Sequence, residues 1–235
     1  MVKTRIFFAV MMLIGSITVF STSCSKDDKT QADDQGKTFT DPRDGKVYKI
    51  ITIGNQTWFA ENLNYTTGIE NITDAVEWES MFGGSFTIPH EDRAAWCYYE
   101  NNEANGDIYG ALYTHAGALV ACPSGWHLPS EQEWVQLTDY LGGLAGAGGR
   151  MKESGETHWL TPNEGANNAS GFSALPAGRR SYSPGNFHDI GSKAYFWSQE
   201  KTDFPHCLQL LNDFCTVGEE HWFMSTGMSV HCIKD

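Results

Sequence analysis

The first 23 residues decide which part of this chain has to fold and in which compartment it folds. Lys3 and Arg5 precede an apolar run from Ile6 to Phe20, which is shorter than the roughly 20 residues that a membrane-spanning helix needs. A positively charged start followed by such a run is typical of a cleaved secretory signal, so we expect residues 1–23 to be removed. The mature chain then folds outside the cytosol, where disulfides form.

The residues behind this signal predict a membrane anchor. Ser21-Thr22-Ser23-Cys24 resembles the lipobox of bacterial lipoproteins, in which the cysteine is acylated and becomes the mature N-terminus. A plain secretory signal with an incidental cysteine is the alternative. Residues 24–40 have almost nothing to bury and are predicted to form a flexible acidic tether.

The start of this tether also carries a localisation signal. Ser25-Lys26-Asp27-Asp28 resembles the acidic signal that routes lipoproteins of the Bacteroides group to the outer face of the outer membrane. We therefore expect an outer-membrane lipoprotein, anchored in the membrane through Cys24 and exposed at the cell surface. A periplasm-facing orientation is the alternative.

The charge balance excludes one class of partner. The chain has 16 Lys and Arg against 29 Asp and Glu, a net charge of −13, and no basic stripe that could neutralise phosphates. We therefore expect no nucleic-acid binding. The 40% of apolar residues can form a real core, and no linker or charge run divides residues 41–235, which we interpret as one domain.

The first half of this domain mixes strand and helix patterns. Residues 47–53 alternate as a strand does, Gly54-Asn55 suits a two-residue hairpin loop, and residues 56–59 would return as the partner strand. Apolar residues from Ile108 to Leu119 recur at spacings of three and four behind Asp107, which predicts a helix.

The second half begins with the clearest helix start. Ser130 and Glu133 form a capping box, and Gly142-Gly143 is a suitable stop for the helix that follows. The glycine-rich stretch 142–149 lacks the Lys-Ser/Thr of a phosphate loop, and we interpret it as a flexible turn. Helices followed by an antiparallel sheet assembled late place the chain in the α+β class. The late strands are predicted at residues 173–178, 194–199, 207–211 and 229–233.

Several ordered blocks of sequence carry a family resemblance. They are Asp44 to Tyr48, Ile53 to Trp58, Glu61 to Leu63, Tyr109 to Tyr113, Cys122 to Trp134, Gly171 to Gly178, Tyr195 to Ser198 and Ser229 to Asp235. With these blocks the chain resembles the Fibrobacter succinogenes major paralogous domain, found in secreted proteins and lipoproteins of Bacteroidetes and Fibrobacter. Leu128 to Trp134 also looks like a block of the formylglycine-generating, sulfatase-modifying enzymes. That kinship implies a C-type-lectin-like fold, in which two helices flank a small curled antiparallel sheet with long loops and the chain ends pair.

The same resemblance bears on the cysteines. Because it places the block before the second helix and the last strand at fixed ends, it implies that Cys122 pairs with Cys232. Cys207 with Cys215 is our second predicted pair, which leaves Cys97 over. Four cysteines allow three pairings, so other connectivities stay open.

Catalytic and metal chemistry find little support. A zinc site would draw on His206, Cys207, Cys215, His221, His231 and Cys232. These residues contain no Cys-x-x-Cys and no closely spaced His pair, so we expect no metal site and no cofactor, and leave open a structural calcium ion around residues 100–103. An enzyme of the formylglycine-generating type needs a closely spaced redox cysteine pair, whereas seven residues separate Cys207 from Cys215. The sequence also contains no nucleophile motif and no His-Glu-x-x-His, so we expect that the protein is not an enzyme.

A binding surface is the remaining possibility. Aromatic rings cover the C–H faces of sugars, while amides and carboxylates fix their hydroxyl groups. The loops of the second half offer such groups in Trp159, Asn163, Glu164, Asn167, Asn168, Tyr182, Asn186, His188 and Trp222. Thr161-Pro162-Asn163 lacks the acid with which calcium-dependent lectins begin this triplet, so sugar binding of that kind is not expected.

Our leading hypothesis is a non-catalytic, lectin-like surface lipoprotein that binds a glycan or a protein in adhesion or recognition. An enzyme related to the formylglycine-generating group and a purely structural envelope protein are the alternatives.

Overall fold

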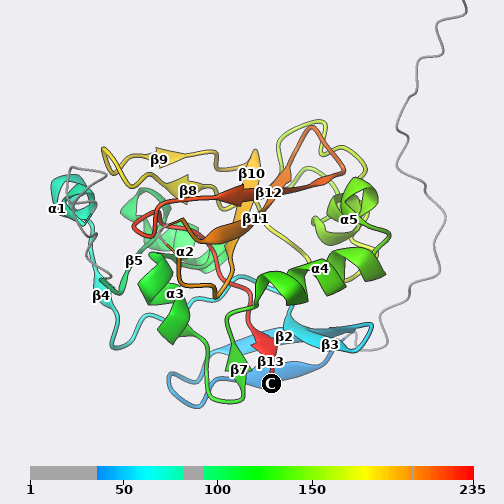
Figure 1. Ribbon diagram of the computed structural model, residues 1–235, viewed down its shortest axis with the longest axis horizontal. Coiled ribbons are helices and arrows are strands. Elements are labelled where there is room, and N and C mark those ends of the chain that lie inside the picture. The colour runs from blue at the N-terminus through cyan, green and yellow to red at the C-terminus, as the bar shows by residue number, and fades with distance from the viewer. Residues whose placement is uncertain (1–35, 82–92, 203) are drawn as a thin grey trace, which may run out of the picture.

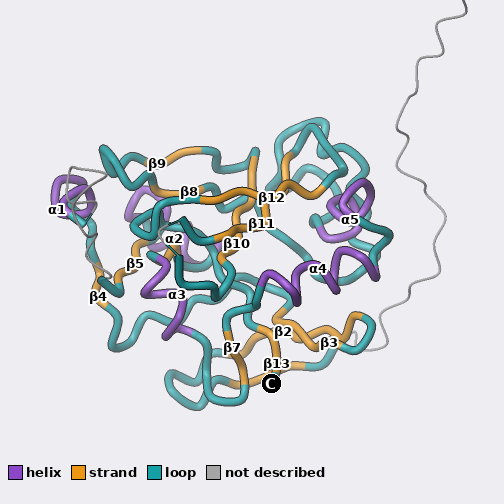
Figure 2. The backbone as a smooth tube through the Cα atoms, in the orientation of Figure 1, coloured by secondary structure: helices purple, strands orange, loops and turns teal. Residues whose placement is uncertain are grey.

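The computed structural model describes residues 36–81, 93–202 and 204–235 (Figure 1). They form an α+β fold in which short strands gather in several small, mostly antiparallel sheets and helices α1 to α5 pack beside them. Long loops connect these elements (Figure 2). The predicted signal peptide and Cys24 lie outside the described residues. Among the described helices, none has the length and apolar character needed to cross a membrane.

One sheet joins the two ends of the domain. Its strands are ordered β1 (Thr38–Thr40), β2 (Val47–Ile53), β3 (Gln56–Phe59), β13 (Ile233–Lys234) and β7 (Trp126–His127). The predicted hairpin is confirmed, because Ile53 pairs with Gln56 across Gly54-Asn55. The last strand, β13, lies between β3 and β7, so the chain ends pair as expected (Figure 1).

The first strand corrects the predicted start of the domain. Residues 38–40 were assigned to the tether, but they pair with residues 47–49. The Phe39 ring lies 5.3 Å from Trp126 and 5.7 Å from Phe59, so this segment packs a partly buried aromatic side chain against the core, although its neighbours in the sequence are polar. The ordered domain therefore begins before Asp41.

The capping-box helix α4 (Glu131–Tyr140) is confirmed. The Ser130 hydroxyl accepts a hydrogen bond from the Glu133 amide at 3.2 Å, and the Glu133 carboxylate accepts one from the Ser130 amide at 2.8 Å. Trp134 and Leu137 on one face of α4 are buried. The Trp134 ring packs 4.8 Å from Trp58 of β3, so α4 covers the sheet that joins the chain ends.

The predicted helix from Ile108 to Leu119 is wrong. The chain instead forms α2 (Glu103–Tyr109), β6 (Leu112–Tyr113) and α3 (His115–Ala121). Gly110 ends α2 with a φ of +71°, and a side chain there would meet the Leu63 carbonyl at 2.8 Å. β6 pairs with β5 (Ala95–Cys97), a contact with a distant segment that local periodicity does not reveal.

The prediction that the glycine-rich stretch is a flexible turn is also wrong, because most of it forms α5 (Leu144–Met151). A Cβ atom on Gly148 would lie 2.5 Å from the Thr216 carbonyl oxygen, and one on Gly149 would lie 2.4 Å from that of Gly165. The glycines therefore allow close packing of a helix against loop backbone, at the expense of helix propensity.

The second sheet consists of β10 (Lys193–Trp197), β11 (His206–Leu211) and β12 (Val217–His221). The first two match the predicted strands at 194–199 and 207–211. The sequence missed β12, whose glycine and glutamates do not alternate with apolar residues. In place of the strand predicted at 173–178, the structure has one isolated bridge, between Lys152 and Ala174. In place of the strand predicted at 229–233, it has β13 and a bridge between Phe196 and Ser229.

Smaller elements complete the described fold. They are β4 (Glu70–Asn71), α1 (Ala75–Ser80), the 3-10 turn η1 (Tyr99–Asn101), β8 (Arg179–Arg180) and β9 (Phe187–His188). β4 joins β5 and β6, and β8 pairs with β9 as a hairpin.

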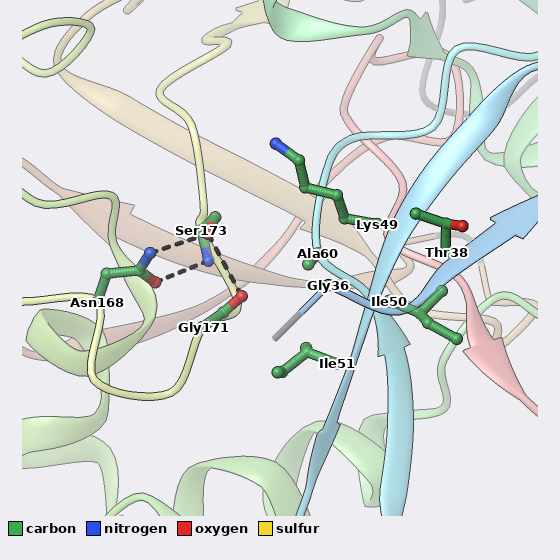
Figure 3. Close-up of a pocket in the computed structure, with 9 residues that line it drawn as sticks. All are labelled: Gly36, Thr38, Lys49, Ile50, Ile51, Ala60, Asn168, Gly171 and Ser173. Carbon is green, nitrogen blue, oxygen red and sulfur yellow. Dashed lines mark hydrogen bonds between the residues drawn. The ribbon is translucent and has the colours of Figure 1, made fainter. Parts of the chain in front are cut away.

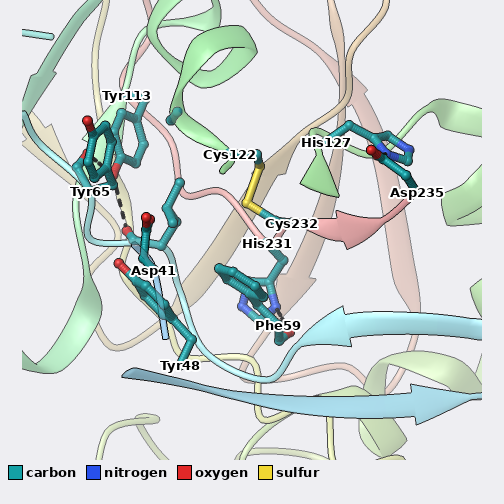
Figure 4. Close-up of a disulfide and its surroundings, with 12 residues drawn as sticks. Asp41, Tyr48, Phe59, Tyr65, Tyr113, Cys122, His127, His231, Cys232 and Asp235 are labelled. Atoms are coloured by element: carbon teal, nitrogen blue, oxygen red, sulfur yellow. Dashed lines mark hydrogen bonds and ion pairs between the residues drawn. A yellow bond between two sulfur atoms is a disulfide. The ribbon is translucent and has the colours of Figure 1, made fainter. Parts of the chain in front are cut away.

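One of the two predicted disulfides is confirmed. Cys122 and Cys232 are bonded, with Cα atoms 5.8 Å apart across 110 residues of chain (Figure 4). The predicted Cys207–Cys215 pair is wrong, because Cys207 is a free, buried thiol, as is Cys97. Val217 pairs with Leu210, which lies three residues, or roughly 10 Å along β11, from Cys207. Cys215 precedes Val217 in the turn and is therefore too far from Cys207 for a disulfide.

Candidate functional site

The nine predicted ligand residues separate into two groups. Trp159, Asn163, Glu164, Asn167 and Asn168 belong to the loop after α5, while Tyr182, Asn186, His188 and Trp222 belong to the β8–β9 hairpin and the end of β12. The two groups have different environments.

Two residues of the first group serve the core. Trp159 is 1% exposed and its indole donates to the Ala174 carbonyl at 2.9 Å. Asn163 is 6% exposed, and its amide donates to the carbonyls of Glu153 and Gly155. The prediction of exposed ligand-binding side chains is therefore wrong for both.

Asn168 lines a pocket of about 340 Å³ between β2 and this loop (Figure 3). The side chain of Ile51 points to the side of β2 on which Asn168 and Ser173 lie, whereas that of Ile50 points away from them. The Asn168 side chain accepts from the Ser173 amide and donates to the Ser173 hydroxyl, both at 2.9 Å. Its polar atoms are thus engaged within the loop. Glu164 and Asn167 are exposed on the same loop and do not line this pocket.

The second group lies beside an aromatic cluster, which we define as Tyr182, Phe204 and Phe223. The Tyr182 and Phe223 ring centres are 4.2 Å apart, and those of Phe204 and Phe223 are 4.8 Å apart. Phe204 is 46% exposed, and the other two are half-buried. Phe223 thus contacts both other rings, and the three side chains form an apolar patch at the surface of the kind that marks binding sites.

Trp222 stands next to this cluster and is held by a cation. The Arg179 guanidinium lies 4.4 Å from the centre of the Trp222 ring and 3.3 Å from the Asp189 carboxylate. The Tyr195 hydroxyl donates to the same carboxylate at 2.8 Å. Asp189 therefore fixes Arg179, which in turn fixes the half-buried indole of Trp222.

The hairpin that carries Tyr182 and Asn186 is anchored by a buried charge. Arg180 is 0% exposed, and its guanidinium donates to the carbonyls of Gly185, Ile72, Thr73 and Asp74. It also lies 4.3 Å from the centre of the Trp78 ring and 5.0 Å from that of Phe187. The side chains of Asn186 and His188, on the same hairpin as Tyr182, are exposed.

A second buried charge fixes the loop after α5. The Lys152 ammonium donates to the carbonyls of Glu164, Leu211 and Phe214 at 2.8 to 3.0 Å. Burial lowers the pKa of Lys152 to about 8 despite the nearby carboxylates of Glu164 and Asp213. This one side chain ties the loop to the β11–β12 hairpin.

The structure does not bring together the six residues of the zinc set or form a calcium site from residues 100–103. Cys232 is in the disulfide, and His231 contacts the Phe59 carbonyl and the Asn62 amide oxygen, 2.9 Å from each (Figure 4). In the calcium segment the Asn102 side chain caps α2. Within the described residues, no three His, Cys, Asp or Glu side chains are grouped closely enough to hold a metal ion as they stand.

Sequence reasoning missed Arg179, Phe204 and Phe223. Phe223 follows Trp222 directly, so the neighbouring aromatic was a signal that could have been used. Arg179 and Phe204 reach the same surface only through the pairing of β8 with β9 and the course of the chain before β11.

The family resemblance is confirmed. The model of the Fibrobacter succinogenes major domain matches residues 51–234, and the chain belongs to this family. No curated protein and no solved structure matches the chain.

Proposed function

We propose that this protein is a surface-exposed outer-membrane lipoprotein whose domain binds a glycan without transforming it. The observation that carries the proposal is the aromatic cluster of Tyr182, Phe204 and Phe223 with the cation-held Trp222 beside it. Aromatic faces pack on the apolar C–H side of a sugar ring, and the exposed Asn186 and His188 would supply hydrogen bonds to its hydroxyls.

The cluster is also suitably rigid for binding. Arg180 and Asp189 hold the hairpin and Arg179 in place, so little side-chain freedom would be lost when a ligand binds. A neutral saccharide also needs no charge complement. These properties favour recognition over catalysis.

We also propose a C-type-lectin-like fold for the domain. The pairing of β13 with β3 and β7, which joins the chain ends, and the packing of α4 against that sheet support it. The lipid anchor at Cys24 and the surface location rest on the N-terminal sequence.

The enzymatic alternative needs a reactive thiol, and the two free thiols among the described residues are poorly suited to that role. Cys97 and Cys207 are both 0% exposed. Burial raises the pKa of Cys97 to about 12 and raises that of Cys207 further above its usual value. A catalytic cysteine instead needs a thiolate and access to substrate.

Binding to a glycan array tests the proposal. We expect the protein to bind a subset of glycans. We expect Tyr182→Ala, Phe223→Ala and Trp222→Ala each to weaken binding about fivefold or more, since a sugar face stacked on a ring contributes on the order of 1 kcal/mol or more. Tyr140→Ala is the matched control, because Tyr140 is an exposed aromatic residue on α4, 52% accessible.

Equal loss in the Tyr140→Ala variant, or undiminished binding in all three cluster variants, would show that the ligand does not use this surface. Binding confined to proteins on a parallel host-protein array would replace the glycan by a protein ligand.

A further inference from the structure

Strands β11 and β12 carry a group of titratable side chains that glycan binding does not use. His206 and His221 are direct cross-strand neighbours, and Glu219 lies two residues before His221. Because side chains alternate along a strand, these two imidazoles and the carboxylate project from the same face of the sheet.

His206 has an unusual environment. It is 3% exposed, yet neither of its ring nitrogens has a hydrogen-bond partner among the described residues. Its Nε2 atom is 3.9 Å from the Glu219 carboxylate, too far for a hydrogen bond. Leaving a buried polar group unpaired costs free energy, so such groups normally have a partner.

His221 is oriented as a metal ligand would be. Its Nδ1 atom lies 3.1 Å from the Phe204 carbonyl oxygen, which can only accept, so Nδ1 carries the hydrogen and Nε2 keeps the lone pair of the neutral ring. The ring centres of His221 and His206 are 5.6 Å apart. Two imidazoles bound to one zinc ion at about 2.0–2.1 Å have their ring centres at roughly this separation.

The surrounding charges favour a cation. Burial is the largest effect on His206 and lowers the pKa of its ring, while the nearby carboxylates of Glu131, Glu219 and Glu200 attract a positive charge. One Glu200 oxygen accepts from the Glu131 amide at 2.9 Å, while the other is buried without a donor. A buried imidazole and a buried carboxylate oxygen, both unpartnered, thus belong to the same small region.

We propose that His206, His221 and Glu219 bind one divalent transition-metal ion of the zinc type, with the Glu200 carboxylate beside it. Glu219 and His221 are exposed, so a rotamer change can bring their donor atoms to His206. Imidazole and carboxylate are accepted zinc ligands, and two or three of them with water complete a tetrahedral site. The two imidazoles come from neighbouring strands, so their spacing in the sequence does not form a short metal-binding motif. This site does not depend on the proposed glycan binding.

Zinc binding by the purified full chain, prepared without a polyhistidine tag and stripped with chelator, tests the proposal by calorimetry and by metal analysis after dialysis. We expect one Zn²⁺ per chain, and we expect His221→Ala and Glu219→Gln each to weaken binding at least tenfold. Both substitutions are at exposed positions, so the variants should melt at the wild-type temperature in chelator.

His188→Ala is the matched control, because His188 is an exposed histidine on a different hairpin, and it should bind zinc as the wild type does. The proposal is overturned if the wild type retains less than half an equivalent of zinc, or if His221→Ala and Glu219→Gln bind as tightly as the wild type.

Discussion

At the scale of single residues, buried charges connect segments that lie far apart in the sequence. Lys152 and Arg180 have no carboxylate partner at hydrogen-bond distance in the described structure, and each is surrounded by backbone carbonyls instead. Carbonyl oxygens satisfy the donors without requiring a second buried charge. A sequence shows the lysine or arginine but not the loop backbone that converges on it.

His127 on β7 also connects distant segments, through contacts with two carboxylates. Its ring contacts Asp235 at 2.7 Å and Glu133 at 3.0 Å, one carboxylate at each nitrogen. Partial burial opposes protonation of the ring, but the hydrogen bonds to Asp235 and Glu133 outweigh it and raise the pKa of His127. The charged ring therefore links β7, the end of β13 and the start of α4.

The sign of the pH dependence follows from this shift. Because the pKa is higher in the folded state, the contact stabilises fully below about pH 6.5 and is lost as the pH rises through the folded-state pKa. We expect an NMR titration to give a pKa above 6.5 for His127 and a lower value in Asp235→Asn. The melting temperature of the wild type should fall between pH 6.5 and 8.5 relative to that of His127→Gln. An unchanged pKa in Asp235→Asn would contradict this assignment.

At the scale of elements, α5 shows how packing overrides propensity. Gly148 has backbone of Thr216 and Cys215 where a side chain would be, whereas Gly146 in the same helix has open space. The helix exists because its apolar residues Ala147 and Met151 join the core. Its glycines set how closely the helix approaches the turn before β12.

This contrast gives a matched pair of substitutions. We expect Gly148→Ala to lower the free energy of unfolding by about 2 kcal/mol or more, because the backbone that the new methyl group meets cannot move cheaply. Gly146→Ala should raise it by about 0.5–1 kcal/mol through helix propensity alone. Denaturant unfolding of the two variants measures both, and a stabilised Gly148→Ala would show that α5 does not pack as described.

The sequence predicted the elements that are specified by local signals and missed those that depend on contacts with distant segments. The β2–β3 hairpin and α4 are specified by their own residues, the Gly54-Asn55 turn and the Ser130–Glu133 capping box. The break between α2 and α3 depends on Leu63, whose carbonyl occupies the space beside Gly110. Periodicity over residues 108–119 contains no information about that neighbour.

At the scale of the whole molecule, the disulfide and β13 close the domain. Cys122 precedes α4 and Cys232 precedes β13, so one covalent bond connects the middle of the chain to its end (Figure 4). The closed loop spans 110 residues, and in the chain-entropy model a loop of this length stabilises the fold by about 4–5 kcal/mol.

Removal of this bond should therefore be costly. We expect Cys122→Ser to lower the free energy of unfolding by up to about 4–5 kcal/mol, measured by thermal or denaturant unfolding. Cys207→Ala, which removes a buried free thiol, controls for loss of a sulfur from the interior and should cost less. Equal losses in the two variants would mean that packing, not the covalent link, explains the effect.

The candidate site was predicted only in part. Tyr182 belongs to the aromatic cluster, Trp222 directly precedes Phe223, and Asn186 and His188 are exposed on the hairpin of Tyr182. Trp159 and Asn163, in contrast, are buried. A loop position in the sequence does not distinguish a ring that faces solvent from one that turns inward. That distinction depends on which core atoms lie beneath the loop, as Ala174 does beneath Trp159.

The sequence by itself determined the family, the α+β class, the hairpin, the capped helix and, through the family resemblance, the Cys122–Cys232 bond, because turns, caps and ordered motif blocks are written in neighbouring residues. Only the tertiary structure decided that Phe223 meets both Tyr182 and Phe204, that His206 faces His221, and that a glycine-rich run is a helix. Strand register and close backbone packing bring these residues together, and both arise from contacts between segments that are far apart along the chain.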